Sequence, residues 1–288
     1  MKIHARAARL VDTGQGLKFT ESPRWRDGRW WFLDIHGGAV RSVDPQGSLR
    51  TELELPFKPN GLGFRRDGSL MLGDALGRQV YRWDGQALTK VADLSATTVF
   101  CLSDGLVDGH DRMYIGDIGY NFFDPANAPV HTCVITCIEP DGRARVVADG
   151  LSFPNGMALT PDGRTLIVAE TMGHRLTAYD VRPDGGLAHR RVWAPLAADV
   201  SPDGIALDAE GGVWLANPEG RHAVLRVREG GEVTDAVELD TQAYAVMLGG
   251  PQRRQLLLCT SDSHDPALIA QSPSATLRVL EVAAPGLP

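Results

Sequence analysis

The hydrophobic positions of this chain fall in short runs that alternate with polar positions, and turn-forming dipeptides separate the runs. Such a run ends in an Asp-Gly, Asn-Gly or similar turn and is followed by a second short strand, and this unit recurs roughly every 40 to 50 residues. The recognisable copies begin at Glu21, Asn60, Asp104, Asn155, Asp203 and, more weakly, near Tyr244. A repeat of this length made of several strands is typical of a β-propeller.

The repeats predict an all-β fold, a six-bladed β-propeller with four-stranded antiparallel blades, in a single domain that spans residues 1–288. We place the blades at residues 21–55, 58–93, 100–149, 153–194, 201–239 and 244–282. Turns such as Asp27-Gly28 and Asp67-Gly68 separate apolar runs, as hairpin turns do, because glycine accepts a positive φ. No heptad or long helical periodicity competes with this interpretation.

The N-terminal segment 2–11 alternates like a strand and precedes the first full repeat. We expect it to form the outer strand of the last blade, beside residues 276–282, and so to close the ring and remove an exposed sheet edge. Blade three carries an extra stretch, residues 119–130, that is longer than a hairpin needs. Loops of this length are often functional lids, and a disordered surface excursion is the alternative.

The formal net charge of −7 argues against a nucleic-acid partner, which requires a basic face. The first ten residues lack the apolar core of a signal peptide, and no run of about 20 apolar residues could span a bilayer. We therefore expect a cytoplasmic protein that acts on a small-molecule substrate, without a membrane partner, as a monomer or small homo-oligomer.

The four cysteines show no Cys-x-x-Cys spacing that would indicate a zinc site. Cys133 and Cys137 share one face of a predicted strand, but they would lie roughly 13 Å apart, too far for a disulfide. We interpret them as buried thiols. Cys101 is the exception, because it lies beside candidate site residues.

Three side chains with oxygen atoms begin motifs of innermost strands: Glu21 in Glu-Ser-Pro, Asn155 in Pro-Asn-Gly and Asp203 in Pro-Asp-Gly. Because they occupy the same place in blades one, four and five, they can face one another across the central channel. Calcium and magnesium prefer oxygen ligands of this kind. The alternative is that the Asn-Gly and Asp-Gly pairs only form turns.

The resemblance to a known family becomes specific in four phrases. They are Glu21-Ser-Pro-Arg-Trp, Phe153-Pro-Asn-Gly-Met-Ala-Leu-Thr-Pro-Asp-Gly, Ala169-Glu-Thr, and Pro202-Asp-Gly-Ile-Ala-Leu-Asp-Ala-Glu-Gly-Gly-Val-Trp-Leu-Ala. Together they resemble the regucalcin/gluconolactonase/luciferin-regenerating enzyme family of six-bladed propellers, over nearly the whole chain. The resemblance implies that Glu21, Asn155 and Asp203 hold one divalent metal ion, with calcium expected first and zinc, manganese or magnesium as alternatives. It also implies hydrolysis of sugar lactones, or of phosphotriesters as in related propellers.

Blade three departs from the family pattern, which usually reads Arg-x-Asn-Asp-Gly with the Arg and first Asn at the substrate or the metal. This chain has Cys101-Leu-Ser-Asp-Gly instead, so Ser103 offers a hydroxyl at the Asn position. The change weakens the expectation of a gluconate-like polyol as the substrate. Asp117 begins Asp-Ile-Gly-Tyr-Asn, which is similar to a branch of the family. We predict that Cys101, Ser103 and Asp117 bind the substrate.

The first hypothesis is a metal-dependent hydrolase of a lactone or related cyclic ester. The cation would polarise the carbonyl, and Asp203 would assist the attack by water. His264 is the rival base and a candidate substrate contact, since an unperturbed pKa of about 6.5 suits proton transfer near neutral pH; a solvated loop histidine is the alternative. A phosphotriester hydrolase on the same site and a non-catalytic ligand-binding propeller are the other two hypotheses. No Gly-x-Ser-x-Gly elbow supports a serine hydrolase.

Overall fold

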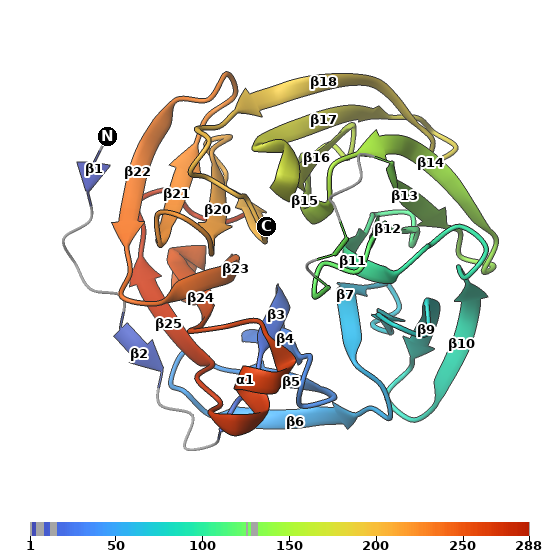
Figure 1. Ribbon diagram of the computed structural model, residues 1–288, viewed down its shortest axis with the longest axis horizontal. Coiled ribbons are helices and arrows are strands. Elements are labelled where there is room, and N and C mark those ends of the chain that lie inside the picture. Colours follow the sequence, from blue (N-terminus) through green and yellow to red (C-terminus); the bar gives the residue numbers. More distant parts are fainter. Residues whose placement is uncertain (1, 4–8, 12–15, 125, 128–131, 288) are drawn as a thin grey trace.

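The protein folds into a ring of six β-sheets around a central axis (Figure 1). This computed structural model describes residues 2–3, 9–11, 16–124, 126–127 and 132–287. The innermost strand of each blade faces the axis, and the outermost strand forms the rim. The six-bladed, four-stranded antiparallel propeller predicted from the repeats is therefore confirmed.

The strands follow the predicted blades closely. Blade one contains β3 (Thr20–Arg26), β4 (Arg29–Asp34), β5 (Ala39–Val43) and β6 (Leu49–Glu54). Blade two contains β7 (Pro59–Phe64), β8 (Leu70–Asp74), β9 (Gln79–Trp83) and β10 (Leu88–Asp93). Blade three contains β11 (Cys101–Val107), β12 (Met113–Ile118), β13 (Cys133–Ile138) and β14 (Ala144–Leu151).

The second half of the chain continues the pattern. Blade four contains β15 (Pro154–Leu159), β16 (Thr165–Glu170), β17 (Arg175–Val181) and β18 (Leu187–Pro195). Blade five contains β19 (Ile205–Leu207), β20 (Val213–Asn217), β21 (Ala223–Val227) and β22 (Val233–Glu238). Blade six contains β23 (Gln242–Gly249), β24 (Gln255–Ser261) and β25 (Thr276–Glu281). Short helices are η1 (Thr171–Gly173), η2 (Pro251–Arg253) and α1 (Pro266–Gln271); no helix of the described ranges is long and apolar enough to cross a membrane.

The N-terminal segment closes the ring, as predicted, through β2 (Arg9–Val11). This strand pairs antiparallel with β25, and Val11 lies opposite Leu277. The prediction does not hold for β1 (Lys2–Ile3), which pairs in parallel with β22 of blade five. The open edge of β22 offers unpaired backbone groups, and such an edge can accept even a two-residue strand. Residues 4–8 of the predicted strand lie outside the described residues.

Turn chemistry and apolar packing explain why the repeats form blades. Asp27 and Gly28 have φ values of 50° and 76°, as a two-residue type I′ hairpin turn requires. Between blades, fully buried aromatic side chains fill the interface; Trp30 packs near Leu257, for example. Burial of one large apolar side chain contributes about 2 to 3 kcal/mol, so the blades hold one another in place.

The innermost strands share two features that position side chains in the channel. Register shifts lie between Glu21 and Arg24, Asn60 and Leu62, Leu102 and Gly105, Pro154 and Met157, and Ala243 and Ala245. Such β-bulges change the direction in which the local side chains point. The inner strands also approach closely: a Cβ on Gly156 would lie 2.6 Å from the Asp203 carbonyl oxygen. Glycine is required there because the strands converge toward the axis.

Candidate active site

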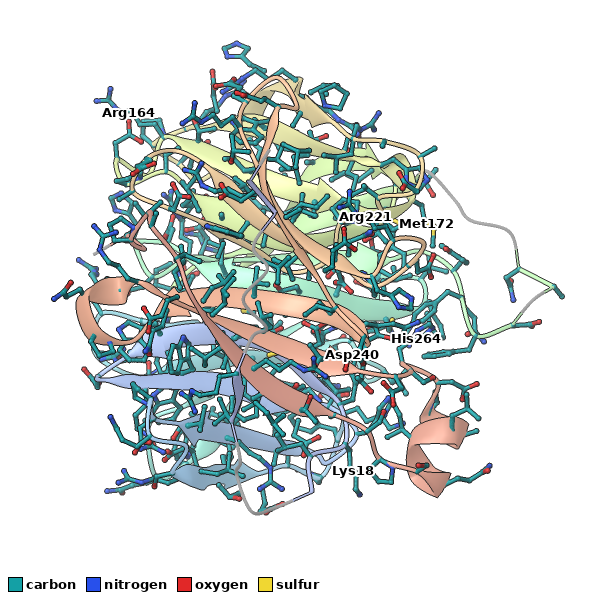
Figure 2. All side chains as sticks on the ribbon, turned by 90° about the vertical axis from the view of Figure 1, so that its left-hand side faces the viewer. Lys18, Arg164, Met172, Arg221, Asp240 and His264 are labelled. Atoms are coloured by element: carbon teal, nitrogen blue, oxygen red, sulfur yellow. The ribbon has the colours of Figure 1, made fainter. Side chains whose placement is uncertain are left out.

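A pocket opens at one end of the central channel, on the face where Met172 and His264 lie and where α1 projects (Figure 2). It holds about 1120 Å³ of empty space, its open mouth included. Every blade contributes a polar side chain to its lining. These are Glu21, Asn60, Ser103, Asn155, Asp203 and Tyr244, in the order of blades one to six.

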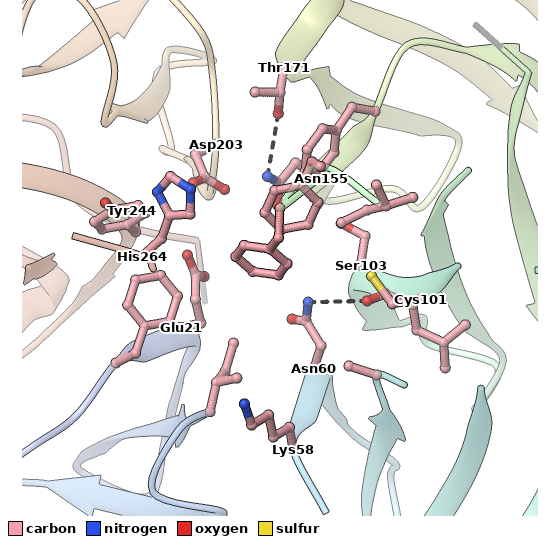
Figure 3. Close-up of a pocket in the computed structure, with 18 of the residues that line it drawn as sticks. Glu21, Lys58, Asn60, Cys101, Ser103, Asn155, Thr171, Asp203, Tyr244 and His264 are labelled. Carbon is pink, nitrogen blue, oxygen red and sulfur yellow. Dashed lines mark hydrogen bonds between the residues drawn. The ribbon is translucent and has the colours of Figure 1, made fainter. Parts of the chain in front are cut away.

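The three predicted metal-binding residues come together in this pocket (Figure 3). Glu21 lies on β3, Asn155 lies on β15, and Asp203 lies just before β19. Glu21 and Asp203 are 7% and 8% exposed, so water reaches them only from the pocket. The structure therefore places two carboxylates and an amide from three distant stretches around one space.

Burial makes both carboxylates harder to ionise. Burial raises the pKa of Glu21 to about 8, and the nearby Asp104 carboxylate adds to the rise. Burial also raises the pKa of Asp203 well above its ordinary value, and the charges of Glu21 and Asp104 act in the same direction. Among the described residues, no Lys or Arg forms an ion pair with Glu21 or Asp203. A cation bound between the two carboxylates would offset this repulsion.

The donor set fits a hard divalent cation. Carboxylate and amide oxygens are the ligands that calcium and magnesium prefer, and water supplies the remaining positions. The described part of the chain has no cluster of three or more His, Cys, Asp or Glu side chains that could hold a metal. Of the three proposed ligands, only Glu21 and Asp203 are of these residue types. The third ligand would be the amide oxygen of Asn155.

The Thr171 hydroxyl fixes the orientation of the Asn155 amide. Thr171 Oγ1 donates to the Pro202 carbonyl oxygen at 2.8 Å, so it must accept from Asn155 Nδ2, which lies 3.3 Å away. The Asn155 amide nitrogen is thereby turned toward Thr171, and the amide oxygen is left for the pocket (Figure 3). The sequence analysis did not single out Thr171, although it ends the phrase Ala169-Glu-Thr on which the resemblance rests.

Asp104 supports the site from behind and does not line the pocket. Its Oδ1 accepts hydrogen bonds from Ser22 Oγ at 2.8 Å and from the Gly105 backbone N–H at 2.7 Å. Arg24 forms an ion pair with the same carboxylate at 3.3 Å. Ser22 has a φ of 51°, a strained value for a residue with a side chain. The network fixes the backbone beside Glu21, and it pairs the Arg24 guanidinium with Asp104.

The structure brings Cys101, Ser103 and His264 to the pocket wall. Burial, followed by the Asp117 charge, raises the pKa of the Cys101 thiol to about 12, so this thiol stays protonated and is a poor nucleophile. Ser103 is almost fully buried on β11. The ring centroid of His264 lies 6.2 Å from that of Tyr244. Their roles in substrate binding stay predictions.

Asp117 does not line the pocket. It ends the second strand of its blade, where a polar side chain holds the loop that enters the first strand. In other blades the corresponding bonds run from the backbone N–H of Phe19 to Asp34 at 3.1 Å, from Ser152 to Glu170 at 2.9 Å, and from Ser201 to Asn217 at 2.7 Å. The Val99 backbone, which precedes β11, acts on Asp117 in the same way, and the Val134 N–H on β13 also donates to Asp117, at 2.6 Å. The repeat therefore gives Asp117 a structural role in blade three.

Asp117→Asn is expected to flatten the pH dependence of stability. Burial raises the pKa of Asp117 from 3.8 to about 6, although the backbone N–H groups of Val134 and Val99 act to lower it. A raised folded-state pKa stabilises the fold most below pH 4, and the contribution is lost as the pH rises through 6. The wild type should lose about 2 kcal/mol more than the variant between pH 4 and pH 7. Urea unfolding at both pH values measures this difference, and equal losses would contradict it; Asp149→Asn on the exposed rim is the control.

Three further charged or titratable side chains line the pocket: His36, Lys58 and Glu219. Burial and the Lys58 charge lower the pKa of His36, so its imidazole is neutral near pH 7. All three residues lie outside the innermost strands, on connections whose positions no repeat specifies. No signal in the sequence points to them.

The fold and the pocket define a six-bladed propeller with an acidic small-molecule site in its central channel. A family model described as the SMP-30/Gluconolactonase/LRE-like region matches residues 19–262. The chain belongs to this family, and the resemblance seen in the sequence is confirmed.

The similar proteins include lactonases. The 6-deoxy-6-sulfogluconolactonase of Pseudomonas putida is 28% identical over 84% of this chain and 82% of its own length. The pentonolactonase of Haloferax volcanii is 26% identical over 97% of this chain and 96% of its own. Among solved structures, the calcium-binding protein regucalcin of Agrobacterium tumefaciens has a TM-score of 0.81 at 22% identity, covering 100% of this chain and 97% of that one. This last likeness shows the fold.

Proposed function

We propose that this protein hydrolyses a lactone or related cyclic ester with one divalent cation held by Glu21, Asn155 and Asp203. The observation that carries the proposal is the convergence in one pocket of two buried carboxylates, whose pKa values burial raises, with an oriented amide. The lactonases among the similar proteins support the reaction type. The location in the cytoplasm and the monomeric or small homo-oligomeric state stay predictions from the sequence.

The reaction needs one water molecule and a group that moves its proton. A cation held by Glu21, Asn155 and Asp203 would supply a Lewis acid that polarises the ester carbonyl. Water attacks the carbonyl carbon, and Asp203 accepts the proton that the water loses. The bond between the acyl carbon and the ring oxygen then breaks, and Asp203 returns the proton to the departing alkoxide. The product is an open-chain hydroxy acid.

Asp203 is the first candidate base because it is a buried carboxylate in the same pocket as the other two proposed cation ligands, where it can take a proton from a water in that space. His264 lines the same pocket and is the second candidate base. Glu21 and Asn155 serve as ligands, with Thr171 holding the amide of Asn155 in place.

Assays of a lactone panel and an organophosphate triester, each with added calcium, zinc, manganese or magnesium, test the proposal. We expect lactone hydrolysis with at least one cation and a much slower reaction with the triester. Triester turnover without lactone turnover would replace the proposal with a phosphotriester hydrolase. No turnover with any cation would favour a non-catalytic ligand-binding propeller.

A further inference from the structure

We infer that the substrate of this pocket is a lactone whose ring carries an apolar substituent, an alkyl chain or an aromatic ring, and not the row of hydroxyls of a sugar lactone. The inference rests on the proposed function and names the substrate class of the same site. Three observations carry it: an aromatic wall in the pocket, an apolar mouth, and two amide side chains, Asn60 and Asn155, whose nitrogen atoms already donate hydrogen bonds within the protein.

Four phenylalanines, Phe100, Phe122, Phe123 and Phe153, form what we name the aromatic wall, and all four line the pocket. Phe122 is its centre. Ring centroids lie 6.2 Å apart for Phe100 and Phe122, 4.1 Å for Phe122 and Phe123, and 5.6 Å for Phe122 and Phe153. A contiguous wall of rings offers a large apolar contact surface and no hydroxyl partner.

The wall continues to the axial side of the pocket and to its mouth. The His264 ring lies 6.0 Å from Phe122, and beyond it the ring of Tyr244 lies 4.8 Å from that of Phe19. Toward solvent, Phe123 is 45% exposed, and Leu76, which also lines the pocket, is 54% exposed. Exposed large apolar side chains that adjoin a pocket indicate a surface that a ligand covers.

The two amide side chains of the lining have few free bonds for the hydroxyls of a substrate. Asn60 Nδ2 donates to the Leu102 carbonyl oxygen at 3.3 Å, and Asn60 Oδ1 accepts from the Gly61 N–H at 2.9 Å. The amide nitrogen of Asn155 donates to the Thr171 hydroxyl, which in turn donates to the Pro202 carbonyl oxygen. A sugar lactone would place several hydroxyls against rings that cannot pair with them, and unpaired buried hydroxyls weaken binding.

The acidic end and the aromatic wall would therefore bind different parts of the substrate. The ester group would lie at Glu21, Asn155 and Asp203, while the substituent would lie against the wall and extend toward the mouth. Removing one methylene from water is worth about a fourfold change in affinity. A pentyl chain that is half buried against the wall should raise kcat/KM by about 30-fold.

Three lactones with the same six-membered ring test the inference on the cation-loaded wild-type enzyme. These are δ-valerolactone without a substituent, δ-decalactone with a pentyl chain, and D-glucono-δ-lactone with hydroxyls. We expect δ-decalactone to have the highest kcat/KM, about 30-fold above δ-valerolactone. A higher value for gluconolactone than for δ-decalactone would overturn the inference and leave lactone hydrolysis standing.

Two variants locate the preference in the wall. Phe123→Ala, and Phe122→Ala combined with Phe123→Ala, should lower the ratio of kcat/KM for δ-decalactone over δ-valerolactone by about threefold and tenfold. Val146→Ala removes an equally exposed apolar side chain from the outer strand of blade three and should leave the ratio unchanged. An unchanged ratio in the folded double variant would contradict the role of the wall.

Binding measured without turnover separates this inference from the proposed function. In the Asp203→Asn variant, isothermal titration compares δ-decalactone with gluconolactone directly. If the wild type hydrolyses no lactone but δ-decalactone binds more tightly, the proposed reaction fails and apolar recognition stands. Equal or weaker binding of δ-decalactone would refute apolar recognition, whatever the outcome for catalysis.

Discussion

Asp203→Asn is expected to lower kcat/KM for lactone hydrolysis by about 1000-fold, because it removes the proposed proton acceptor and the charge of one cation ligand together. The substitution keeps the size of the side chain and one oxygen atom, so the pocket should keep its shape. Asp203 is buried, and it lines the same pocket as Glu21 and Asn155. Initial rates measured by pH-stat at saturating cation test the loss, and titration calorimetry measures the cation affinity separately.

Asp149→Asn is the matched control, because this exposed aspartate lies far from the pocket lining on β14 and should leave the rate unchanged. His264→Gln tests the rival base. If His264→Gln causes the larger loss while Asp203→Asn still turns over within threefold of the wild type, Asp203 is not the base. Thermal unfolding of each variant shows whether a loss of rate reflects a loss of folded protein.

The fold could be predicted because each blade repeats a local pattern. Hairpin turns such as Asp27-Gly28 fix strand pairs within a few residues, and the repeat length fixes the number of blades. The pairing of Lys2 and Ile3 with blade five could not be predicted. Two residues carry no periodicity, and the edge of β22 that they join is defined only by the folded ring.

The candidate site could be predicted where it follows the repeat. Glu21, Asn155 and Asp203 begin equivalent strands, and equivalent strands meet at the axis of a propeller. The same repeat explains Asp117, which occupies a structural position that is seen only once the hydrogen bonds of other blades are compared. The aromatic wall could be predicted only in part. The extra stretch 119–130, for which the sequence suggests a functional lid, supplies Phe122 and Phe123, although residues 125 and 128–130 of it lie outside the described residues. The packing of these rings against Phe100 and Phe153 depends on tertiary structure that no repeat specifies.

Removing divalent cations with a chelator is expected to abolish lactone hydrolysis and to lower Tm. Without a cation, burial favours the protonated forms of Glu21 and Asp203, and ionising both would place two like charges in one pocket. A cation that binds only the folded state stabilises it by about 2.7 kcal/mol at a hundred times its Kd. Calcium, zinc, manganese and magnesium are added back one at a time, with scanning calorimetry for Tm and rate measurements in parallel.

The rise in Tm on adding the cation should grow from pH 6 to pH 8. The folded-state pKa of Glu21, about 8, lies above its ordinary value of 4.5, so the metal-free fold loses stability as the pH rises through this range. The cation competes with those protons, so it binds more tightly at higher pH. Glu21→Gln combined with Asp203→Asn should remove both the pH dependence and most of the cation effect. A Tm that no cation changes at pH 8 would exclude the proposed metal site, since two buried carboxylates would then persist without the charge that best offsets them.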